Sequence, residues 1–511
     1  MDSDGGVLRL RPDVALHVEV DDATAFGSPL GPRPDGETRR RFAAVRDHVE
    51  RHGVESLVAR GPALLAAAVE GGALDGVAAE VGPRGWTLRD EVLHPDPARA
   101  RPSALVAATA PGDGVRLRVE DGLWPEVHST VAALAGAAGL APGTALTPDE
   151  RVLVQALADA GAVERAAPLP GDRALTEPGL TFLGHNGVVV RSATTRVVVD
   201  PFVCPAEPGA PYRPLTLAEV GPLDAVVVTH SHPDHFALAT LLQVPQGTTV
   251  VVPRVERETV LSVAMGQRLR QLGFSRVVEL GWGERCTVGD IEVHALPFLG
   301  EQPTDGAVLH PEIRNAGNTY VIRTPAFSIA ALADSGRDGT GDVKDLAVEA
   351  RERLGPVDVL FCGYRAWQLY PVQHLSSSVA RYLLFVPPAL WGCRLQLMND
   401  ADDAVDVAER WGARVLVPYA DGGAPWFWER GLGPRLDEEA AEIESVDPFP
   451  ERVLAAAARR VQAPSGEWLG SPVPVLLLRP NDSLLGVGAR EPTVHRLPGN
   501  AWPYRPLAVV R

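Results

Sequence analysis

Short apolar runs rich in β-branched residues recur through the second part of the chain, and most of them end at polar or acidic residues. Their length and their glycine, proline or aspartate boundaries indicate buried strands, whereas the segments between them have helical spacing. The predicted strands are 188–190, 197–199, 223–228, 248–253, 291–298, 318–323, 327–333, 357–363, 414–418 and 473–478. The predicted helices are 236–242, 255–272, 342–354, 402–411 and 450–461. This alternation predicts a mixed α/β fold.

The pattern before residue 178 is different and predicts a separate mixed α/β accessory domain. Helical spacing covers 38–60, 62–69 and 127–138, and 115–119 alternates like a strand. Another helix opens at Thr147 with a proline and two acidic residues, the signature of a capped N-terminus. We therefore divide the chain into 1–178 and a catalytic domain at 179–511 with a C-terminal extension. The first domain is expected to dimerise or to dock a partner, without taking part in the chemistry.

Candidate chemistry is concentrated directly after the strand at 223–228. The chain there reads Thr229-His230-Ser231-His232-Pro233-Asp234-His235 and then resumes at helical spacing. Three imidazoles and a carboxylate on one strand-to-helix loop can converge on one or two metal ions. Buried histidine and aspartate side chains are also hard to satisfy in any other way. The motif therefore predicts a metal site at the strand edge.

This motif, with a preceding hairpin that ends in Asp200-Pro201, resembles the metallo-β-lactamase superfamily from about Leu180 to Asp421. The resemblance implies an αββα sandwich with a dinuclear site at one edge. It also implies that Asp334, in Asp334-Ser335-Gly336, bridges the two metals. Hydrolases of this superfamily have histidines at two places where this chain has Glu301 and Tyr419. His374 is the histidine left to complete the second metal position, and His294 is expected to pack in the core.

The substitution of Glu301 changes the charge of the predicted centre. The proposed ligands are His230, His232, Asp234, His235, Glu301, Asp334 and His374. Two zinc ions with three carboxylates and a hydroxide carry a net charge of about zero, whereas two ferric ions with an oxo bridge keep about +1. Hard oxygen ligands mixed with imidazoles also suit iron. We therefore expect two iron ions with an oxo or hydroxo bridge, and two zinc ions as the alternative.

The accessory domain and the displaced ligands together resemble the diiron oxygenase branch of this superfamily, which includes the β-hydroxylase of chloramphenicol biosynthesis. That resemblance implies a monooxygenase, with Glu301 and Asp334 central to catalysis. It also implies hydroxylation at the β-carbon of an aminoacyl group carried on the phosphopantetheine of a nonribosomal peptide synthetase carrier domain. Electrons must come from an external donor, because no flavin or nicotinamide fingerprint is present. The competing interpretation is a dinuclear zinc hydrolase of the lactonase or phosphodiesterase type.

Candidate substrate-binding residues flank the last two metal positions. Arg365, Trp367 and Tyr370 precede His374, and Tyr419 follows the final strand. Aromatic walls with a few polar groups suit a tethered amino acid. Arg365 and Arg381 are candidates for a local basic surface that binds an acidic carrier domain.

Composition and charge exclude several other functions. The formal charge of −17 over 511 residues argues against nucleic-acid and anionic-membrane partners, because the overall field repels polyanions. No apolar segment is long enough to span a bilayer, and the four cysteines lack disulfide or metal spacing. We therefore expect a cytoplasmic enzyme with reduced cysteines, and a homodimer.

Overall fold

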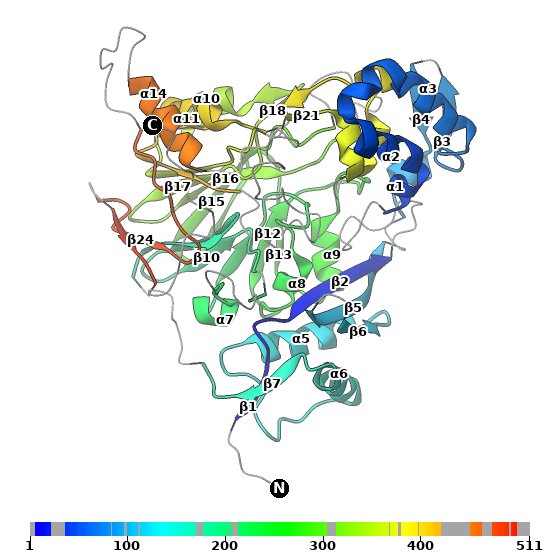
Figure 1. Ribbon diagram of the computed structural model, residues 1–511. Helices are drawn as coiled ribbons and strands as arrows, with labels where there is room; N and C mark the ends of the chain where they lie inside the picture. Colours follow the sequence, from blue (N-terminus) through cyan, green and yellow to red (C-terminus); the bar gives the residue numbers. More distant parts are fainter. Residues whose placement is uncertain are drawn as a thin grey trace.

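The computed structural model describes residues 6–497 except for 22–35, 83, 97–99, 111–112, 170–176, 204, 207–212, 304–312, 367, 377–379, 397, 421–449, 462–472 and 490–491. Two β-sheets lie at the centre, with helices on both outer sides (Figure 1). The predicted αββα sandwich is confirmed. Two further units built from the N-terminal residues pack against it at separate places, one at the upper right and one at the bottom of the view in Figure 1.

The first central sheet has eight strands. In spatial order they are β13 (Val277–Leu280), β12 (Thr249–Pro253), β11 (Ala225–Val227), β10 (Arg196–Val199), β9 (Gly187–Arg191), β8 (Gly179–Gly184), β24 (Ser483–Leu485) and β25 (Thr493–His495). The strands from β10 to β13 are parallel, so their carboxyl ends share one edge. The C-terminal residues extend this sheet through β24, which pairs with β8.

The second central sheet has six strands. In spatial order they are β14 (Arg285–Val288), β15 (Ile291–Pro297), β16 (Asn318–Arg323), β17 (Ser328–Ala331), β20 (Val359–Cys362) and β23 (Val415–Pro418). The last three strands are parallel. Short two-stranded ribbons lie outside it: β18 (Arg337–Asp338) with β19 (Gly341–Asp342), and β21 (Gln368–Leu369) with β22 (Leu395–Gln396).

Side-chain alternation along the strands explains why the sheets stack. On β10, Val197 and Val199 face the second sheet, whereas Val198 faces the opposite side. On β17, Ile329 and Ala331 point into the space between the sheets, and Ala330 points away. Because both faces of each sheet are buried, the strands read as continuous apolar runs in the sequence. The core between the sheets therefore fixes their register at the edge where the polar loops begin.

Helices cover the two outer faces. The eight-stranded sheet is covered by α7 (Leu217–Val220), α8 (Leu238–Leu241) and α9 (Met265–Gln271), and the six-stranded sheet by α10 (Val343–Leu354), α11 (Ala401–Trp411) and α14 (Glu451–Val461) (Figure 1). Asp400 caps α11 in a capping box, and Gly412 ends it in the left-handed conformation.

Two predicted elements are wrong in length or type. The helix expected over 255–272 is only α9, because Thr259 Oγ1 accepts hydrogen bonds from the backbone N–H groups of Leu261 and Ser262. Such side-chain bonds offer the backbone an alternative to a helix. The strand expected over 473–478 is only a single bridge, between Val475 and Leu416.

The N-terminal residues form two units rather than one. The strand unit, residues 6–21 and 100–169, contains β1 (Val7–Leu10), β2 (Ala15–Asp21), β5 (Arg101–Ala110), β6 (Asp113–Arg118), α5 (Trp124–Ala135), α6 (Pro148–Asp159) and β7 (Val163–Ala166). Its two sheets have the orders β2-β5-β6 and β1-β7. The predicted cap of α6 is confirmed, since the Thr147 side chain accepts from the Glu150 N–H in a capping box.

The helical unit, residues 36–96, lies apart from the strand unit (Figure 1). It contains α1 (Gly36–Arg41), α2 (Ala43–His52), η1 (Val54–Ser56), α3 (Leu57–Glu70), β3 (Ala78–Gly82), β4 (Gly85–Leu88) and α4 (Asp90–Leu93). The helical unit packs against three short helical turns, η2 (Pro371–Ser376), η3 (Ala380–Phe385) and η4 (Pro388–Leu390).

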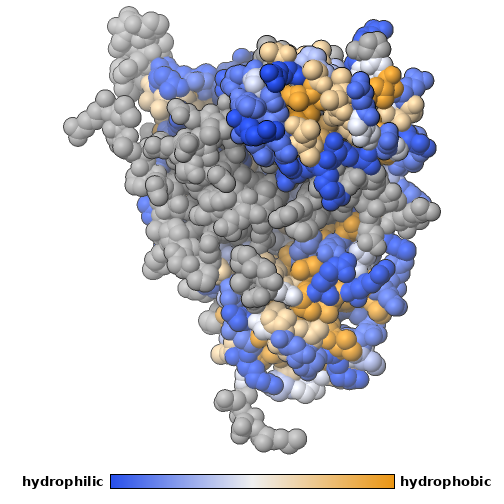
Figure 2. All heavy atoms as spheres, turned by 45° about the vertical axis from the view of Figure 1, so that its right-hand side comes forward, coloured by the Kyte–Doolittle hydropathy of each residue, from blue (hydrophilic) through white to orange (hydrophobic). Residues whose placement is uncertain are grey.

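On the face of the molecule shown in Figure 2, hydrophilic residues dominate the described surface and apolar residues form smaller groups among them.

Both N-terminal units share hydrophobic cores with the sandwich. In the strand unit, Trp124 and Leu134 belong to the same buried cluster as Leu269 of α9. In the helical unit, Phe42 and Trp86 belong to a cluster that includes residues of η2 and η3. The predicted accessory domain therefore shares its cores with the catalytic part, and its expected absence from the chemistry remains a prediction. The boundary near residue 178 remains a prediction, because 170–176 lie outside the described residues.

A buried histidine joins the strand unit to the sandwich. His128 on α5 is fully buried, and its Nδ1 and Nε2 lie 2.9 Å and 2.7 Å from the backbone oxygens of Leu272 and Val244. Burial lowers the pKa of His128 below its usual value of 6.5, although the two carbonyl oxygens oppose this. The imidazole thus resists protonation in the folded protein more than in the unfolded chain.

We expect the free energy of unfolding to fall as the pH drops below about 6.5, because the unfolded chain then binds a proton that folded His128 resists. This group contributes a slope of at most about 1.4 kcal/mol per pH unit. The His128→Gln variant should be less stable at pH 7 by about 1–3 kcal/mol and should lose this part of the slope. Urea unfolding of both proteins between pH 5 and pH 7 measures the difference. Parallel slopes would contradict the prediction.

No described helix is long and apolar enough to cross a membrane. Cys286, Cys362 and Cys393 are free thiols, as expected, and Cys204 lies outside the described residues.

Candidate metal centre

Polar side chains converge where several central strands end. The loop after β11 carries His230, His232, Asp234 and His235, the loop after β15 carries Glu301, and the loop after β17 carries Asp334. Within the described residues, ligand atoms of His230, His232, Glu301 and Asp334 all lie within 4.8 Å of one another. His185, Asp234 and His235 form a second group by the same measure. The structure thus brings together six of the seven predicted ligands.

Short contacts define the arrangement within and between the two groups. His232 Nδ1 lies 3.0 Å from Glu301 Oε2 in the first group, and His185 Nε2 lies 2.9 Å from Asp234 Oδ2 in the second. Asp334 Oδ2 lies 3.8 Å from His230 Nε2 and 3.1 Å from His235 Nε2. Asp334 therefore contacts both groups, which is the position expected of a bridging carboxylate.

Asp200 holds the histidine loop in place. Its carboxylate accepts hydrogen bonds from Thr229 N at 2.7 Å and from Thr229 Oγ1 at 2.5 Å. It also lies 2.8 Å from His235 Nδ1. Because Nδ1 then carries the proton that faces Asp200, Nε2 of His235 is left to face Asp334 and a metal.

Hydrogen bonds also tie the two carboxylate loops together. Ser335 Oγ binds both the N–H and the carbonyl of Leu299, and Gly336 N donates to the same carbonyl. The Tyr419 hydroxyl accepts a hydrogen bond of 2.6 Å from Ala333 N, directly before Asp334. These contacts position Glu301 and Asp334 relative to each other.

Unusual backbone conformations gather at this edge. Five non-glycine residues with positive φ angles lie in or beside these loops: His185, Asp200, Glu301, Ala333 and Ala420. A residue other than glycine pays about 1–3 kcal/mol for such a conformation, and such residues cluster at functional sites. The loops are therefore held in a costly geometry that the surrounding hydrogen bonds maintain.

Burial and neighbouring charges shift the pKa values of several of these side chains. Burial raises the pKa of Asp234, but His235 and His185 together lower it by a larger amount. The pKa therefore lies below its usual value, and the carboxyl group stays ionised. Burial and the neighbouring histidines keep the pKa of His230 well below its usual value, so this imidazole is neutral. Burial lowers the pKa of His235, yet Asp334, Asp234 and Asp200 hold it well above the usual value.

The donor set fits a pair of metal ions. Ionised carboxylates and neutral imidazoles are the forms that ligate divalent metals. His230 Nε2 is buried and makes no hydrogen bond within the described part of the chain, although a buried polar atom normally has a partner. Burial also raises the pKa of Glu301, so its charged form is disfavoured unless a cation lies beside it. The residues present therefore suit a dinuclear centre with mixed oxygen and nitrogen ligands.

One predicted ligand lies elsewhere. His374, on η2, is fully buried, but it belongs to neither group of ligand atoms in the described structure. Its ring instead packs against Tyr382, with ring centroids 5.3 Å apart. His185 occupies the place that we assigned to His374, because the turn between β8 and β9 reaches the same edge.

Sequence reasoning did not identify His185 as a candidate ligand, and it noted Asp200 only as the end of the hairpin. Both lie in the hairpin before the histidine motif, but His185 is 49 residues from its contact Asp234. The available signal was a histidine in the Gly184-His185-Asn186-Gly187 turn, where an exposed side chain is the ordinary expectation. In the structure His185 is 5% exposed, and Asn186 donates to the backbone oxygen of Asp234.

The predicted substrate residues have different positions. Arg365 and Tyr370 are partly exposed after β20, Trp367 lies outside the described residues, and Tyr419 is fully buried beneath Asp334. Arg381 is only 5% exposed, which contradicts its assignment to a surface for a carrier domain. His294 pairs with Glu292 at 3.2 Å and lies outside both ligand groups, as expected.

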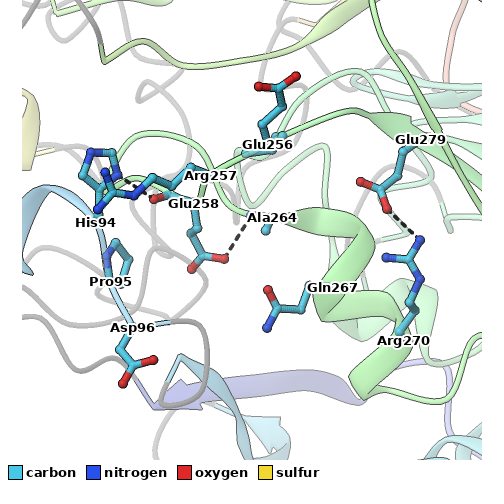
Figure 3. Close-up of a pocket in the computed structure, with 11 residues that line it drawn as sticks. His94, Pro95, Asp96, Glu256, Arg257, Glu258, Ala264, Gln267, Arg270 and Glu279 are labelled. Atoms are coloured by element: carbon cyan, nitrogen blue, oxygen red, sulfur yellow. Dashed lines mark hydrogen bonds and ion pairs between the residues drawn. The ribbon is translucent and has the colours of Figure 1, made fainter.

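A separate cavity of about 460 Å³ lies between the helical unit and the sandwich. Figure 3 shows His94 and Asp96 on one side and Gln267 and Arg270 of α9 on the other. Glu258, in its wall, forms a buried ion pair of 2.7 Å with Arg268. None of the metal-binding residues lines this cavity.

Comparison with known proteins finds similarity to a protein family and to two kinds of enzyme. Residues 195–419 match the family described as the beta-lactamase superfamily domain. The 4-amino-L-phenylalanyl-[CmlP-peptidyl-carrier-protein] 3-hydroxylase of Streptomyces venezuelae is 33% identical over 272 residues, covering 52% of this chain and 46% of that protein. A metal-dependent hydrolase of Thermus thermophilus is 33% identical over 105 residues, covering 20% of this chain and 42% of that protein. These matches span about half the length of each curated relative or less.

The crystal structure of CmlA, a diiron β-hydroxylase from Streptomyces venezuelae, has a similar fold over a longer range. Its TM-score is 0.59 at 19% sequence identity, and the match covers 97% of this chain and 100% of that chain. The similarity includes the N-terminal units as well as the sandwich, because it extends over nearly the whole chain. Residues 195–419 are thus similar to the beta-lactamase superfamily domain, and the chain as a whole has a fold similar to that of the crystal structure of CmlA.

Proposed function

We propose that this protein is a diiron monooxygenase that hydroxylates the β-carbon of an aminoacyl group tethered to a nonribosomal peptide synthetase carrier domain. The observation that carries the proposal is the ligand set itself. Two groups of ligands are joined by Asp334, and Glu301 adds a third carboxylate near the histidine motif. The additional negative charge favours iron over a Lewis-acidic zinc pair. The fold of CmlA and the related carrier-protein hydroxylase support the same reaction class.

The proposed ligands divide between the two metal positions. His230, His232 and Glu301 would hold one iron, and His185, Asp234 and His235 the other, with Asp334 between them. Iron ions held there would supply the redox chemistry that activates dioxygen. The chain supplies orientation, since Asp200 fixes the His235 tautomer and the Ser335 contacts fix Glu301 relative to Asp334.

Exposure indicates the direction from which substrate approaches. The side chains of Asp234, Asp334 and His232 are 14%, 10% and 8% exposed, whereas those of His230, His235 and Glu301 are at most 1% exposed. The reacting carbon must therefore approach from the side of the two aspartates and His232. Hydroxylation places one oxygen atom of dioxygen in a C–H bond and releases the other as water. An external donor of two electrons is therefore part of the proposal.

Metal analysis of the purified full-length protein is the first test. We expect about two iron ions per chain and a near-ultraviolet absorption band from an oxo bridge between ferric ions. Two zinc ions and no such band would instead support the hydrolase alternative, which the similarity to metal-dependent hydrolases favours. A metal-free protein would contradict both functions.

The second test compares substrates. An aminoacyl group loaded as a thioester on a carrier domain should be hydroxylated, and the corresponding free amino acid should not. Turnover should decrease with salt if the acidic carrier meets a local basic surface, for which Arg365 remains a candidate. Equal efficiency with the free amino acid would contradict the carrier-bound substrate. Association of two chains through the N-terminal units is a further proposal, tested by light scattering.

A further inference from the structure

A tyrosine from a distant part of the chain contacts two of the proposed iron ligands. Tyr382, on η3, is fully buried, and its hydroxyl oxygen lies 2.7 Å from His232 Nε2. The same hydroxyl donates a hydrogen bond of 3.2 Å to the backbone oxygen of Glu301. The phenol thus lies between a histidine of the motif and the glutamate that distinguishes this centre.

The direction of these hydrogen bonds determines which histidine nitrogen is free. Because the single phenol proton is donated to Glu301, the oxygen of Tyr382 accepts from Nε2–H of His232. Nδ1 of His232 is then unprotonated, and this is the nitrogen that lies 3.0 Å from Glu301 Oε2. The amide of Asn315 lies 3.3 Å from the same Nε2, and it can turn its oxygen to accept from that N–H as well.

The helical unit holds the segment that carries Tyr382. Trp86 Nε1, on β4, donates a buried hydrogen bond of 3.0 Å to the backbone oxygen of Leu384. The Trp391 ring packs edge-on against both Phe42 and Trp86, with centroids 5.7 Å and 5.9 Å away. Trp391 Nε1 in turn donates to the backbone oxygen of Val386. Contacts at Leu384 and at Trp391 therefore connect the helical unit to the segment that follows Tyr382.

We propose that Tyr382 is a positioning residue of the metal centre, which orients His232 and Glu301 together, and that the helical unit holds it in place through Trp86. The inference rests on the proposed iron ligands. It assigns residues 36–96 an effect on metal binding although the described residues of that unit include no member of either ligand group. Loss of an outer hydrogen-bond partner of a metal ligand typically weakens metal affinity by about 10- to 100-fold.

The test is an anaerobic titration of metal-free full-length protein with ferrous iron. Tyr382→Phe removes only the hydroxyl group, and we expect the dissociation constant of the weaker-bound iron to rise by about 10- to 100-fold. The visible absorption bands of the cobalt(II)-substituted protein should also shift, because one His232 ligand loses its fixed orientation. A merely structural effect on stability would leave that spectrum unchanged.

Tyr320→Phe is the matched control. Tyr320 is also fully buried, and its hydroxyl donates to the backbone oxygen of Val228 at 3.0 Å. Unlike the Tyr382 hydroxyl, it makes no hydrogen bond to His232 or Glu301 among the described residues. This variant should bind iron and cobalt as the wild type does. Trp86→Phe, which removes the hydrogen bond to Leu384, should weaken iron binding in the same direction as Tyr382→Phe but less. If Tyr382→Phe does not fold, the iron affinity of Trp86→Phe provides the test instead.

The outcomes separate this inference from the proposed function. If His232→Ala loses iron but Tyr382→Phe keeps wild-type affinity and the wild-type cobalt spectrum, the positioning role is overturned and the metal centre stands. If His232→Ala also retains both metal ions, the ligand assignment fails, and the inference fails with it. Equal losses of affinity in Tyr382→Phe and Tyr320→Phe would likewise overturn a specific role for Tyr382.

Discussion

Replacement of Glu301 by alanine is expected to remove close to one iron ion per chain and to reduce product formation by more than about 100-fold. Loss of a partner outside the ligand sphere already costs about 10- to 100-fold in metal affinity or activity, and loss of a direct ligand should exceed that. Glu301 is 1% exposed, and its carboxylate oxygen lies 3.0 Å from His232 Nδ1. Iron content by elemental analysis and product formation by mass spectrometry measure the effect.

The fold should survive this replacement. Glu301 lies on a loop, with a positive φ angle of 53°, and not in the core between the sheets. Burial disfavours its charged form, and alanine removes this buried carboxyl group without opening that core. Glu301→His removes one negative charge and should shift the metal content toward zinc.

Two control variants make the assignment of Glu301 specific. His294→Ala changes a histidine on the same strand, β15, which pairs with Glu292 and belongs to neither ligand group. Asp305→Ala changes the other ligand-type residue nearby, which lies outside the described residues. Both variants should keep two iron ions. Full iron and turnover in Glu301→Ala, combined with the loss of both in Asp305→Ala, would show that the wrong carboxylate was assigned.

Deletion of residues 1–176 is expected to leave no cooperatively folded catalytic domain. Trp124, Val131 and Leu157 of the strand unit belong to one buried cluster with residues of the sandwich. The sandwich members of that cluster include Leu241, Leu242, Val244, Leu269, Leu272 and Phe274. Each large apolar side chain returned to water costs about 1.5–3 kcal/mol. Exposure of about five of them therefore costs as much as the whole stability of a typical domain, about 5–15 kcal/mol.

Circular dichroism and thermal unfolding of the deleted chain test this expectation. A matched comparison is deletion of residues 1–5 alone, which precede the described structure and should leave unfolding unchanged. A folded, iron-containing product from deletion of 1–176 would show that the N-terminal residues form the separable accessory domain that the sequence suggested.

The sequence alone determined the sandwich and most of its metal centre. Apolar runs that end in His230–His235, Glu301 and Asp334 place ligand side chains at strand termini, and the carboxyl ends of parallel strands meet at one edge. Candidate ligands can therefore be predicted from the sequence wherever they closely follow a strand. The αββα class and the bridging role of Asp334 were expected from the resemblance to the metallo-β-lactamase superfamily, and the roles of Asp334 and Glu301 as ligands remain predictions.

The tertiary structure alone decided which isolated residues join that edge. His185 and Tyr382 lie 49 and 150 residues from their contacts Asp234 and His232, and no periodicity or spacing links such pairs. His374 is buried like a ligand, yet packing against Tyr382 places it outside both groups. The same holds for the N-terminal residues. Their apolar faces predict that these faces are buried, but not which surface of the protein covers them. Hydrophobic burial has no direction of its own, so only the complete set of packed elements decides that those residues share their cores with the catalytic part.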